Sequence, residues 1–428
     1  MIGNVDTGKT TLLGVLSKGG LDNGRGRARA NIFKHKHELE TGRTSDIGRE
    51  IVGFTSEGRI VNYGQARAPS WTDICEQASK VLLFIDLAGH EKYLKTTVFG
   101  LTGNYPDYSM LMIGSNMGVI GMTKEHYHLT LALKVPCFIV VTKIDICPPH
   151  ILEQTLNVLK RLLKAPGSKK LPLMINNADD VILAARNFNS ESMAPIFQVS
   201  NVTGENLDLL RMFLSLVTPR KDWVKLREDP ALLHIDNTFS VPGVGTVVSG
   251  TLTAGEIHVN ETLLHGPNHF GTFDSVIVKG IHTNRLPVKS ARAGQSISVA
   301  LKKTKRSSTR KGQVLTAPTL APTAIWEFDA DIFVITHSTT ISTSYEAVIH
   351  CGCTRQTAAI IDVEGILRAG LRGRVRFRYK YRAEFIQPGD RIIFREGKTK
   401  GIGNVHKVYV GVAPPLAKVE EVVPTETA

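Results

Sequence analysis

The chain has 428 residues, a formal net charge of +13 and 42% hydrophobic residues, a composition typical of globular proteins and not of disordered or collagen-like ones. At roughly 100 to 200 residues per domain, this length corresponds to two to four domains and excludes a small disulfide-held scaffold. No apolar run approaches the roughly 18 to 20 residues of a membrane helix, and no signal-peptide pattern is present. The five cysteines are odd in number and lack zinc-ligand spacing, which fits a reducing cytoplasm. We therefore expect a cytoplasmic protein, and the short apolar runs predict no membrane segment.

Apolar runs with the length of strands alternate with helical stretches in the first half of the chain. The strand-like runs lie at residues 81–86, 108–113, 137–141 and 196–199. This alternation is typical of a largely parallel sheet, and it predicts an α/β domain.

After Pro219 the helical pattern stops, and short alternating runs are separated by Gly and Pro. Such a pattern favours all-β structure, here two β-barrels. We therefore expect a multidomain α/β plus all-β fold with an α/β domain at 1–220, a linker at 221–230, barrels at 231–318 and 319–412, and a flexible tail at 413–428.

A glycine-rich run near the start of the sequence is the first functional motif. It fits the pattern G-x-x-x-x-G-K-[ST] with Gly3, Asn4, Val5, Asp6, Thr7, Gly8, Lys9 and Thr10. In this pattern backbone amides close around phosphate oxygens, the lysine carries charge to the β- and γ-phosphates, and the final hydroxyl binds Mg²⁺. The run predicts a phosphate-binding loop.

A second motif follows the strand-like run at 81–86. Asp86 ends this run, where a carboxylate can hold the magnesium shell, and the amide of Gly89 can reach a γ-phosphate. Read alone, the motif is a turn after a strand. After a phosphate loop, it predicts a nucleotide site.

A third motif, with Thr142, Lys143 and Asp145, follows the run at 137–141. The carboxylate of Asp145 can accept both the ring N1–H and the exocyclic amine of guanine, a pair that adenine does not offer. Ser200 and Asn201 follow the next run in the same way. Together the motifs predict a GTP-binding domain.

This ordered set of motifs resembles the translational GTPases, which place a His after Asp-x-x-Gly where small signalling G proteins usually have Gln. The resemblance implies that His90 positions the attacking water and is the catalytic residue. It also places Asp6 beside the phosphates. Val5 either forms one side of an apolar gate before His90 or simply packs.

Runs over nearly the whole chain also resemble the eukaryotic GTP-binding protein 1 and 2 subfamily. These runs lie at residues 21–29, 33–38, 42–45, 86–97, 241–251, 355–358 and 394–400. The resemblance implies an architecture similar to elongation factor Tu, with a GTPase domain followed by two β-barrels. It also implies GTP or GDP and Mg²⁺ as cofactors.

The resemblance further implies that Thr44 is the switch I threonine, which meets Mg²⁺ and the γ-phosphate only in the GTP state. Thr41 and Ser45 are the alternatives. With Thr10 and Asp86, Thr44 would complete the magnesium ligands.

Two features depart from the usual pattern. Thr142 replaces the Asn more usual in N-K-x-D, which removes a side-chain amide that bridges base and loop, so we expect modest guanine affinity. In addition, only Met1 and Ile2 precede Gly3, so the first strand that normally carries the loop is expected to be missing, as in a truncated gene model or isoform.

Positive charge is concentrated near the C-terminus. Residues 366–407 contain twelve Lys or Arg but only three Asp or Glu. Within this region six cations, here called the basic stripe, recur at every second position: Arg372, Arg374, Arg376, Arg378, Lys380 and Arg382. On a strand they share one face, about 33 Å long, while Val375, Phe377, Tyr379 and Tyr381 pack on the barrel core. The alternative is a solvated strand face. Because no acids are interleaved, we expect an RNA backbone to relieve the repulsion.

Two further patterns are less specific. The basic run at 302–311 is an exposed loop, a nuclear-localisation patch or an RNA contact. Cys351 and Cys353 alternate within a strand pattern and need no metal.

Two functional hypotheses follow from the sequence. In the first, the chain is a GTP-hydrolysing, elongation factor-like protein in translation or ribosome-associated RNA metabolism, and its GTP state holds tRNA or another RNA for the ribosome. In the second, it is a GTP-switched adaptor whose barrels bind mRNA-decay or signalling proteins without activation by the ribosome. A GTPase subunit of an ATP sulfurylase shares the architecture but fits the subfamily runs less well. We expect a monomer.

Overall fold

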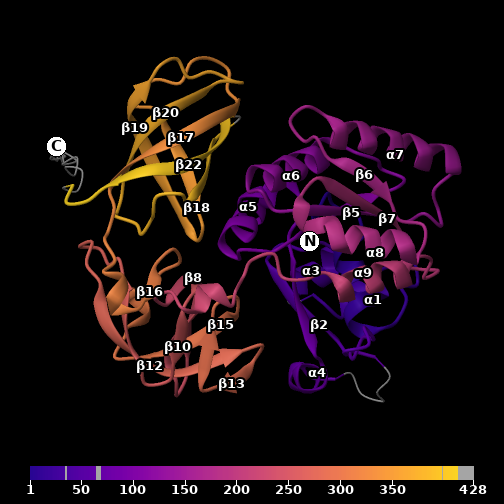
Figure 1. Ribbon diagram of the computed structural model, residues 1–428, viewed down its shortest axis with the longest axis horizontal. Helices are drawn as coiled ribbons and strands as arrows, with labels where there is room; N and C mark the ends of the chain where they lie inside the picture. Colours follow the sequence, from indigo (N-terminus) through magenta and orange to yellow (C-terminus); the bar gives the residue numbers. More distant parts are fainter. Residues whose placement is uncertain (34–35, 64–68, 398, 413–428) are drawn as a thin grey trace, which may run out of the picture.

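The computed structural model describes residues 1–33, 36–63, 69–397 and 399–412 (Figure 1). The predicted tail at 413–428 and Lys398 of the basic C-terminal region lie outside the described residues. The α/β domain forms one half of the molecule, and two β-domains are stacked beside it (Figure 1). No described helix combines the length and apolar character needed to cross a membrane.

The α/β domain is built on a five-stranded parallel sheet, as the alternating pattern predicts. Its strands run in the order β1 (Ile2–Gly3), β4 (Ser109–Gly114), β5 (Cys137–Thr142), β7 (Met193–Gln198) and β6 (Leu171–Met174). A separate antiparallel pair consists of β2 (Gly48–Phe54) and β3 (Lys80–Asp86).

Helices cover both faces of the sheet because successive strand residues point to opposite sides. In β4, Met110 and Met112 share a core with α1, α8 and α9, whereas Leu111 and Ile113 share a second core with α5, α6 and α7. The α-helices are α1 (Lys9–Lys18), α2 (Arg27–Ala30), α3 (Lys36–Thr41), α4 (Trp71–Gln77), α5 (Leu94–Gly103), α6 (Gly121–Ala132), α7 (Pro149–Lys164), α8 (Ala178–Asn187) and α9 (Leu207–Leu216). Short 3₁₀ turns are η1 (Glu91–Tyr93), η2 (Phe188–Ser190), η3 (Lys225–Arg227), η4 (Arg306–Ser308) and η5 (Pro318–Leu320).

The expectation of a missing first strand needs correction. Ile2 and Gly3 form β1, which pairs in parallel with Leu111 and Met112 of β4. Ile2 is fully buried, and the N–H of Leu87 donates to the carbonyl of Met1 at 3.2 Å. Two extended residues are thus enough for ladder pairing, and they fix the phosphate loop at the carboxyl edge of the sheet.

The first β-domain closes six strands into a ring, with β13 added to one of them. The pairing of β11 with β12 completes the ring. The strands are β8 (Leu232–Val241), β9 (Gly245–Ala254), β10 (Glu256–His258), β11 (Thr262–Gly266), β12 (Asp274–Thr283), β13 (Leu286–Val288), β14 (Ser290–Arg292), β15 (Ser296–Lys302) and β16 (Val314–Thr316).

The second β-domain is a closed antiparallel barrel in the order β17, β20, β19, β18, β21, β22. Closure leaves no free sheet edge in the ring, and apolar side chains fill its interior. The strands are β17 (Glu327–Thr336), β18 (Glu346–Cys351), β19 (Thr354–Glu364), β20 (Arg372–Tyr379), β21 (Arg391–Glu396) and β22 (Thr399–Tyr409).

Ion pairs join the three parts of the molecule. They are Arg49–Asp236 between the α/β domain and the first barrel, Arg310–Glu384 between the barrels, and Arg395–Glu125 and Lys400–Glu125 between the second barrel and α6. Arg49 lies at the start of β2, close in sequence to the predicted switch threonine.

Candidate nucleotide-binding site

The phosphate loop lies between β1 and α1, and its shape depends on two glycines. Gly3 has φ 144°, and a Cβ there would lie 2.4 Å from the carbonyl oxygen of Met112. Gly8 has φ 78° and caps the N-terminus of α1, whose first amides therefore face the loop. The sequence pattern is thus explained by backbone geometry that other residues would strain.

Lys9 crosses the loop. Its Nζ donates to the carbonyl oxygens of Gly3 at 3.0 Å and Asn4 at 2.6 Å. Burial lowers the pKa of Lys9 to about 8, while Asp86 and Asp6 act in the opposite direction. The ammonium group is thus held at the centre of the loop, where a phosphate would attract it.

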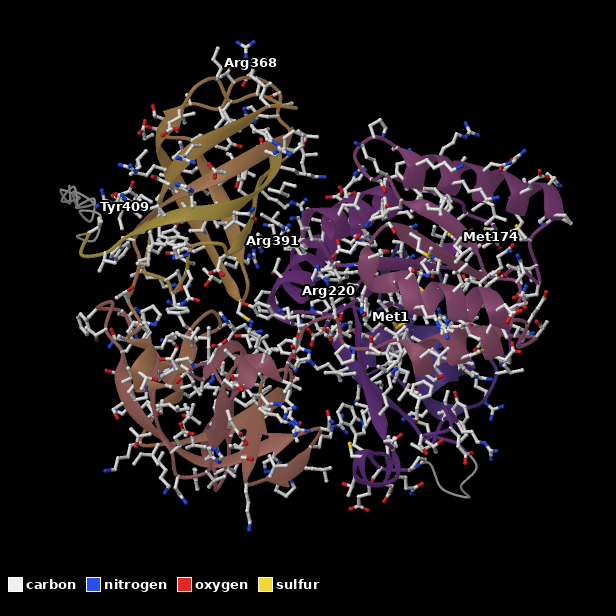
Figure 2. The ribbon with its side chains drawn as sticks, in the orientation of Figure 1. Met1, Met174, Arg220, Arg368, Arg391 and Tyr409 are labelled. Atoms are coloured by element: carbon white, nitrogen blue, oxygen red, sulfur yellow. The ribbon has the colours of Figure 1, made fainter. Side chains whose placement is uncertain are left out.

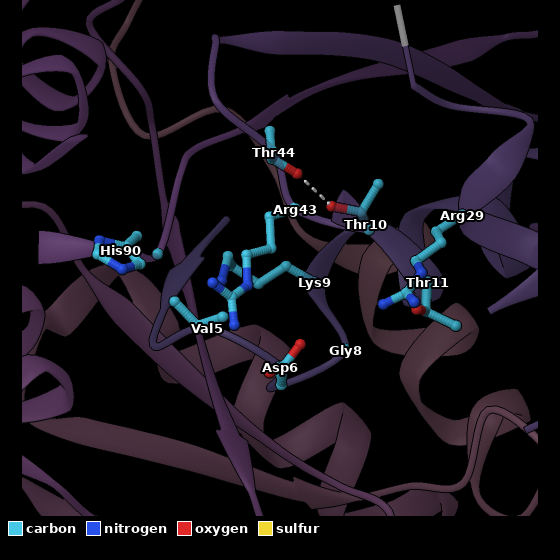
Figure 3. Close-up of a pocket in the computed structure, with 12 residues that line it drawn as sticks. Val5, Asp6, Gly8, Lys9, Thr10, Thr11, Arg29, Arg43, Thr44 and His90 are labelled. Carbon is cyan, nitrogen blue, oxygen red and sulfur yellow. Dashed lines mark hydrogen bonds between the residues drawn. The ribbon is translucent and has the colours of Figure 1, made fainter. Parts of the chain in front are cut away.

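The three predicted magnesium ligands lie together. The hydroxyl of Thr10 donates to Oδ2 of Asp86 at 2.6 Å and lies 2.8 Å from the hydroxyl of Thr44 (Figure 3). Oδ1 of Asp86 is buried and has no hydrogen-bond partner within the described part of the chain. Burial raises the pKa of Asp86, although Lys9 and the Thr10 hydrogen bond act the other way. An unsatisfied buried carboxylate oxygen beside two hydroxyls fits a divalent cation with oxygen ligands.

The structure distinguishes the three switch I candidates. Thr41 donates its hydroxyl to the carbonyl of His37 at 2.7 Å, within its own helix. Ser45 donates to Glu38 at 3.0 Å. Only Thr44 of these three contacts Thr10 in the described structure, so the geometry favours the choice made from the resemblance.

Gly89 and His90 close the other side of the same pocket. A Cβ on Gly89 would lie 2.5 Å from Nζ of Lys9 and 2.6 Å from the carbonyl oxygen of Gly3. His90 is exposed, and its Nδ1 accepts the N–H of Lys92 at 3.1 Å at the start of η1. In the neutral ring this bond places the proton on Nε2. Val5 and His90 both line the pocket, as the gate interpretation requires.

Three residues around the loop were not predicted from the sequence. Arg29 and Arg43 line the phosphate pocket, and Figure 3 shows Arg43 between Thr44 and Val5. His126 of α6 accepts the N–H of Gly3 on Nδ1 at 3.2 Å, and burial lowers the pKa of His126 to about 3. Arg29 and Arg43 lie within runs that carry the resemblance, but no local pattern places these three residues at the loop, because their position depends on how distant segments pack.

The residues predicted for the base lie outside this pocket, and of these Thr142 and Asn201 approach the phosphate loop. Asp145 is exposed, and Lys143 is half-buried with φ 62°. Ser200 accepts the N–H groups of Val202 at 3.2 Å and Thr203 at 3.1 Å, which shapes the turn after β7.

With Thr142 in place of the Asn of N-K-x-D, the side-chain bridge between the base and the phosphate loop was expected to be lost. The structure retains the half of this bridge that reaches the loop. The hydroxyl of Thr142 donates to the carbonyl oxygen of Thr7 at 2.9 Å, so the bridge to the phosphate loop is present. The expectation that the substitution breaks this bridge is therefore wrong on the loop side.

The argument for RNA binding by the basic stripe is also wrong in its premise. Acids do interleave with the stripe, because strand β17 places Asp331, Asp329 and Glu327 opposite alternate arginines of β20. The ion pairs are Arg374–Asp331, Arg376–Asp329, Arg378–Glu327, Lys380–Glu346 and Arg382–Glu384, at 2.8 to 3.3 Å. The local sequence gives no sign of the pairing with Asp331, Asp329 and Glu327, because these acids belong to β17, more than 40 positions before their arginines.

The stripe is also shorter than predicted. β20 ends at Tyr379, so Lys380 and Arg382 lie beyond it, and Tyr381 is 68% exposed instead of packing on the core. Val375, Phe377 and Tyr379 are buried as predicted.

A second cavity of about 330 Å³ lies where the three domains meet. Figure 2 shows two of its lining residues, Arg220 and Arg391, near one another between the second barrel and the α/β domain. It contains none of the residues predicted for the nucleotide.

Comparisons with known proteins agree with this fold. The family of the elongation factor Tu GTP binding domain matches residues 1–219, and elongation factor Tu domain 2 matches residues 245–316. The chain is 56% identical to GTP-binding protein 1 of Xenopus laevis, over 95% of this chain and 62% of that protein. It is 45% identical to GTP-binding protein 2 of Homo sapiens, over 95% of this chain and 68% of that protein. The chain thus spans less than two thirds of the Xenopus relative.

Solved structures show the same fold at low identity. A bacterial selenocysteine-specific elongation factor, EF-Sec, superposes with a TM-score of 0.69 at 18% identity, covering 94% of this chain and 56% of that one. Elongation factor SelB from Methanococcus maripaludis, in complex with the GTP analogue GppNHp, gives 0.67 at 17% identity, covering 96% and 78%.

Proposed function

Because this chain belongs to the GTP-binding protein 1 and 2 subfamily of elongation factor Tu-type GTPases, we propose that it binds GTP with Mg²⁺ and hydrolyses it to GDP and phosphate. The observation that carries the proposal is the contact of Thr10, Asp86 and Thr44 around an unsatisfied carboxylate oxygen. These residues come from three separate segments, and a nucleotide-bound cation explains why they meet.

The chain's own groups supply the binding energy for the phosphates. Amides at the start of α1 and the ammonium group of Lys9 face the loop, so they would hold the β- and γ-phosphates. A phosphate that replaces the loop carbonyls as the partner of Lys9 would also offset the cost of holding its charge in a buried position. Asp145 would select guanine through its two acceptor oxygens.

Magnesium fits the oxygen ligands of Thr10, Thr44 and Asp86. When bound, it neutralises charge that develops on the phosphate oxygens. Because Thr44 lies in the segment before β2, its contact with the site would keep that segment in place only while the γ-phosphate is present.

His90 would orient the attacking water. The water oxygen bonds to the γ-phosphorus, and the bond from this phosphorus to the bridging oxygen breaks. GDP leaves with that electron pair, and a proton of the water passes to a phosphate oxygen, which gives inorganic phosphate. Nε2–H of His90 is the free side of the ring, since Nδ1 accepts the N–H of Lys92. His90 is exposed, so an activating partner would have to bring the ring over the γ-phosphate.

In the cell we propose a cytoplasmic factor in translation or ribosome-associated RNA metabolism, whose GTP state holds tRNA or another RNA. Support comes from the elongation factors among the similar structures. The alternative is a GTP-switched adaptor for mRNA decay or signalling. The ion pairs of the basic stripe with acids of β17 favour this alternative. They neutralise the repulsion between like charges from which RNA binding was inferred.

The deciding experiment measures GTP turnover with and without eukaryotic ribosomes, using His90→Ala as the control. Stimulation that His90→Ala abolishes supports the translational role. Turnover that ribosomes leave unchanged, with labelled GTP still bound, supports the adaptor.

A further inference from the structure

The base end of the site lacks one hydrogen-bond donor. Where N-K-x-D has an Asn, the hydroxyl of Thr142 has a single proton, which points to the carbonyl oxygens of Thr7 at 2.9 Å and Ile113 at 3.3 Å. This proton is therefore used within the protein. Thr142 has no second donor for a purine.

The side chain of Asn201 approaches the same point of the phosphate loop from the turn after β7. A Cβ placed on Gly8 would lie 3.3 Å from Nδ2 of Asn201 and 3.7 Å from Oγ1 of Thr142. Two residues 59 positions apart thus flank Gly8, one with a hydroxyl and the other with an amide.

The side-chain oxygen of Asn201 is buried without a structural use. The residue is 8% exposed, and its Oδ1 has no hydrogen-bond partner in the described ranges. The turn itself is held by other groups: the backbone carbonyl of Asn201 accepts the N–H of Asp22 at 2.9 Å, and Oγ of Ser200 accepts two amides. A buried amide oxygen without a partner is costly, and the oxygen and NH₂ ends of an Asn side chain exchange by a half-turn, so this side chain beside the loop points to a ligand.

We propose that Asn201 supplies the base-contacting amide that position 142 lacks, by donating its NH₂ group to N7 of guanine. This inference rests on the proposed GTP site and names a further specificity-determining residue in it. The edge of guanine that carries N7 and O6 presents only acceptors, which suits an amide donor. Adenine places an amine beside N7, which would oppose the same NH₂ group. Asp145 reads the opposite edge, so the two residues would hold the base from both sides.

Thr142 and Asn201 divide between them the two contacts that the Asn of N-K-x-D makes alone. The hydroxyl of Thr142 retains the tie to the phosphate loop, and Asn201 takes over the contact with the base. This division predicts that guanine affinity is not as modest as the loss of the Asn alone implies.

The test measures equilibrium affinity for GDP and for 7-deaza-GDP, which lacks the N7 acceptor, in the wild-type chain and three variants. One neutral hydrogen bond corresponds to about three- to tenfold in affinity. We expect the wild type to bind 7-deaza-GDP weaker than GDP by this factor. Asn201→Ala should lose the same factor for GDP and bind the two nucleotides equally. Asn201→Asp, which is isosteric but lacks the donor, should bind GDP at least as weakly as Asn201→Ala.

Val202→Ala is the matched control, since it changes the next residue of the same turn, whose side chain is 38% exposed. It should leave both affinities unchanged. The proposal is overturned if Asn201→Ala binds GDP as tightly as the wild type, or if it weakens GDP and 7-deaza-GDP by the same factor. A wild-type chain that binds no guanine nucleotide would instead overturn the proposed function, and this inference with it.

Discussion

The hydroxyl of Thr44 lies 2.8 Å from the hydroxyl of Thr10, although 34 positions separate the two residues. Thr10 is fixed at the start of α1, whereas Thr44 belongs to the segment that leads into β2. The contact therefore connects helix α1 to a segment whose position can depend on whether GTP or GDP is bound.

Thr44→Ala should weaken GTP binding and leave GDP binding nearly unchanged, because only GTP has the γ-phosphate that this segment is proposed to contact. We expect a loss of about tenfold, the low end for a residue that supports a metal site. Titration with fluorescent GDP and a non-hydrolysable GTP analogue measures the difference. Thr41→Ala is the control, since its hydroxyl bonds within α3. Equal losses for both nucleotides would mean that Thr44 is not the switch residue.

His90→Ala should bind GTP as the wild type does but hydrolyse it about 10²-fold more slowly under activating conditions, the loss expected when the attacking water is no longer held in place. The pocket contacts of Lys9, Thr10 and Asp86 do not involve the imidazole, so affinity is preserved. Single-turnover hydrolysis measures the effect. A variant with wild-type turnover would exclude His90 from the chemistry.

Gly89→Ala should lower the affinity for GTP by more than about tenfold. The added Cβ would lie 2.5 Å from Nζ of Lys9 and 2.6 Å from the Gly3 carbonyl, so the phosphate loop must shift. Gly20→Ala is a suitable control, because a Cβ there meets nothing within 4 Å. If both variants bind GTP normally, the close approach of Gly89 to the loop is not functional.

Glu384→Ala should destabilise the two barrels by about 3–5 kcal/mol, since it leaves the guanidinium of Arg310 without its partner at 2.8 Å. The Glu384 side chain is 1% exposed and that of Arg310 is 18% exposed. Glu346→Ala is the contrast, because the Glu346–Lys380 pair is 45% exposed on both sides and is expected to contribute about 0–1 kcal/mol. Urea unfolding of both variants tests the difference, and equal midpoints would contradict it.

Stability of the second barrel should also depend on pH through Asp329. Burial alone would raise the pKa of Asp329, but hydrogen bonds from Arg376 and Tyr409 outweigh it and lower this pKa. A lowered folded-state pKa means that the carboxylate contributes stability above its unfolded pKa of about 3.9, and that this contribution disappears as pH falls through the folded value. Asp329→Asn should therefore be less stable than the wild type at pH 7, by roughly 1 kcal/mol or less, and the difference should shrink only as the pH falls below about 3.9 toward the lowered folded-state pKa. A difference independent of pH would contradict the role of this ion pair.

Local patterns predicted the parts of the molecule that depend on local chemistry. The strand-like runs at 108–113 and 137–141 correspond to β4 and β5, because buried parallel strands are apolar throughout. The run at 81–86 forms β3 as a strand, but in a separate antiparallel pair with β2 and not in the parallel sheet that the alternating pattern predicts.

Features that depend on pairing between distant segments were not predictable. The stripe arginine Arg376 lies opposite Asp329, 47 positions earlier, and no local pattern gives this register. In the same way, the meeting of Thr142 with Asn201 at Gly8, and of Arg43 with the phosphate loop, results from packing alone.

The central claim is that this site recognises Mg²⁺-bound guanine nucleotides, and equilibrium binding of GTP and ATP to the purified chain tests it most directly. We predict saturable binding of GTP that requires Mg²⁺, with ATP bound at least about a hundredfold more weakly, because adenine leaves the carboxylate of Asp145 without its two donors. Equal affinity for GTP and ATP, or no binding of either, would contradict the account.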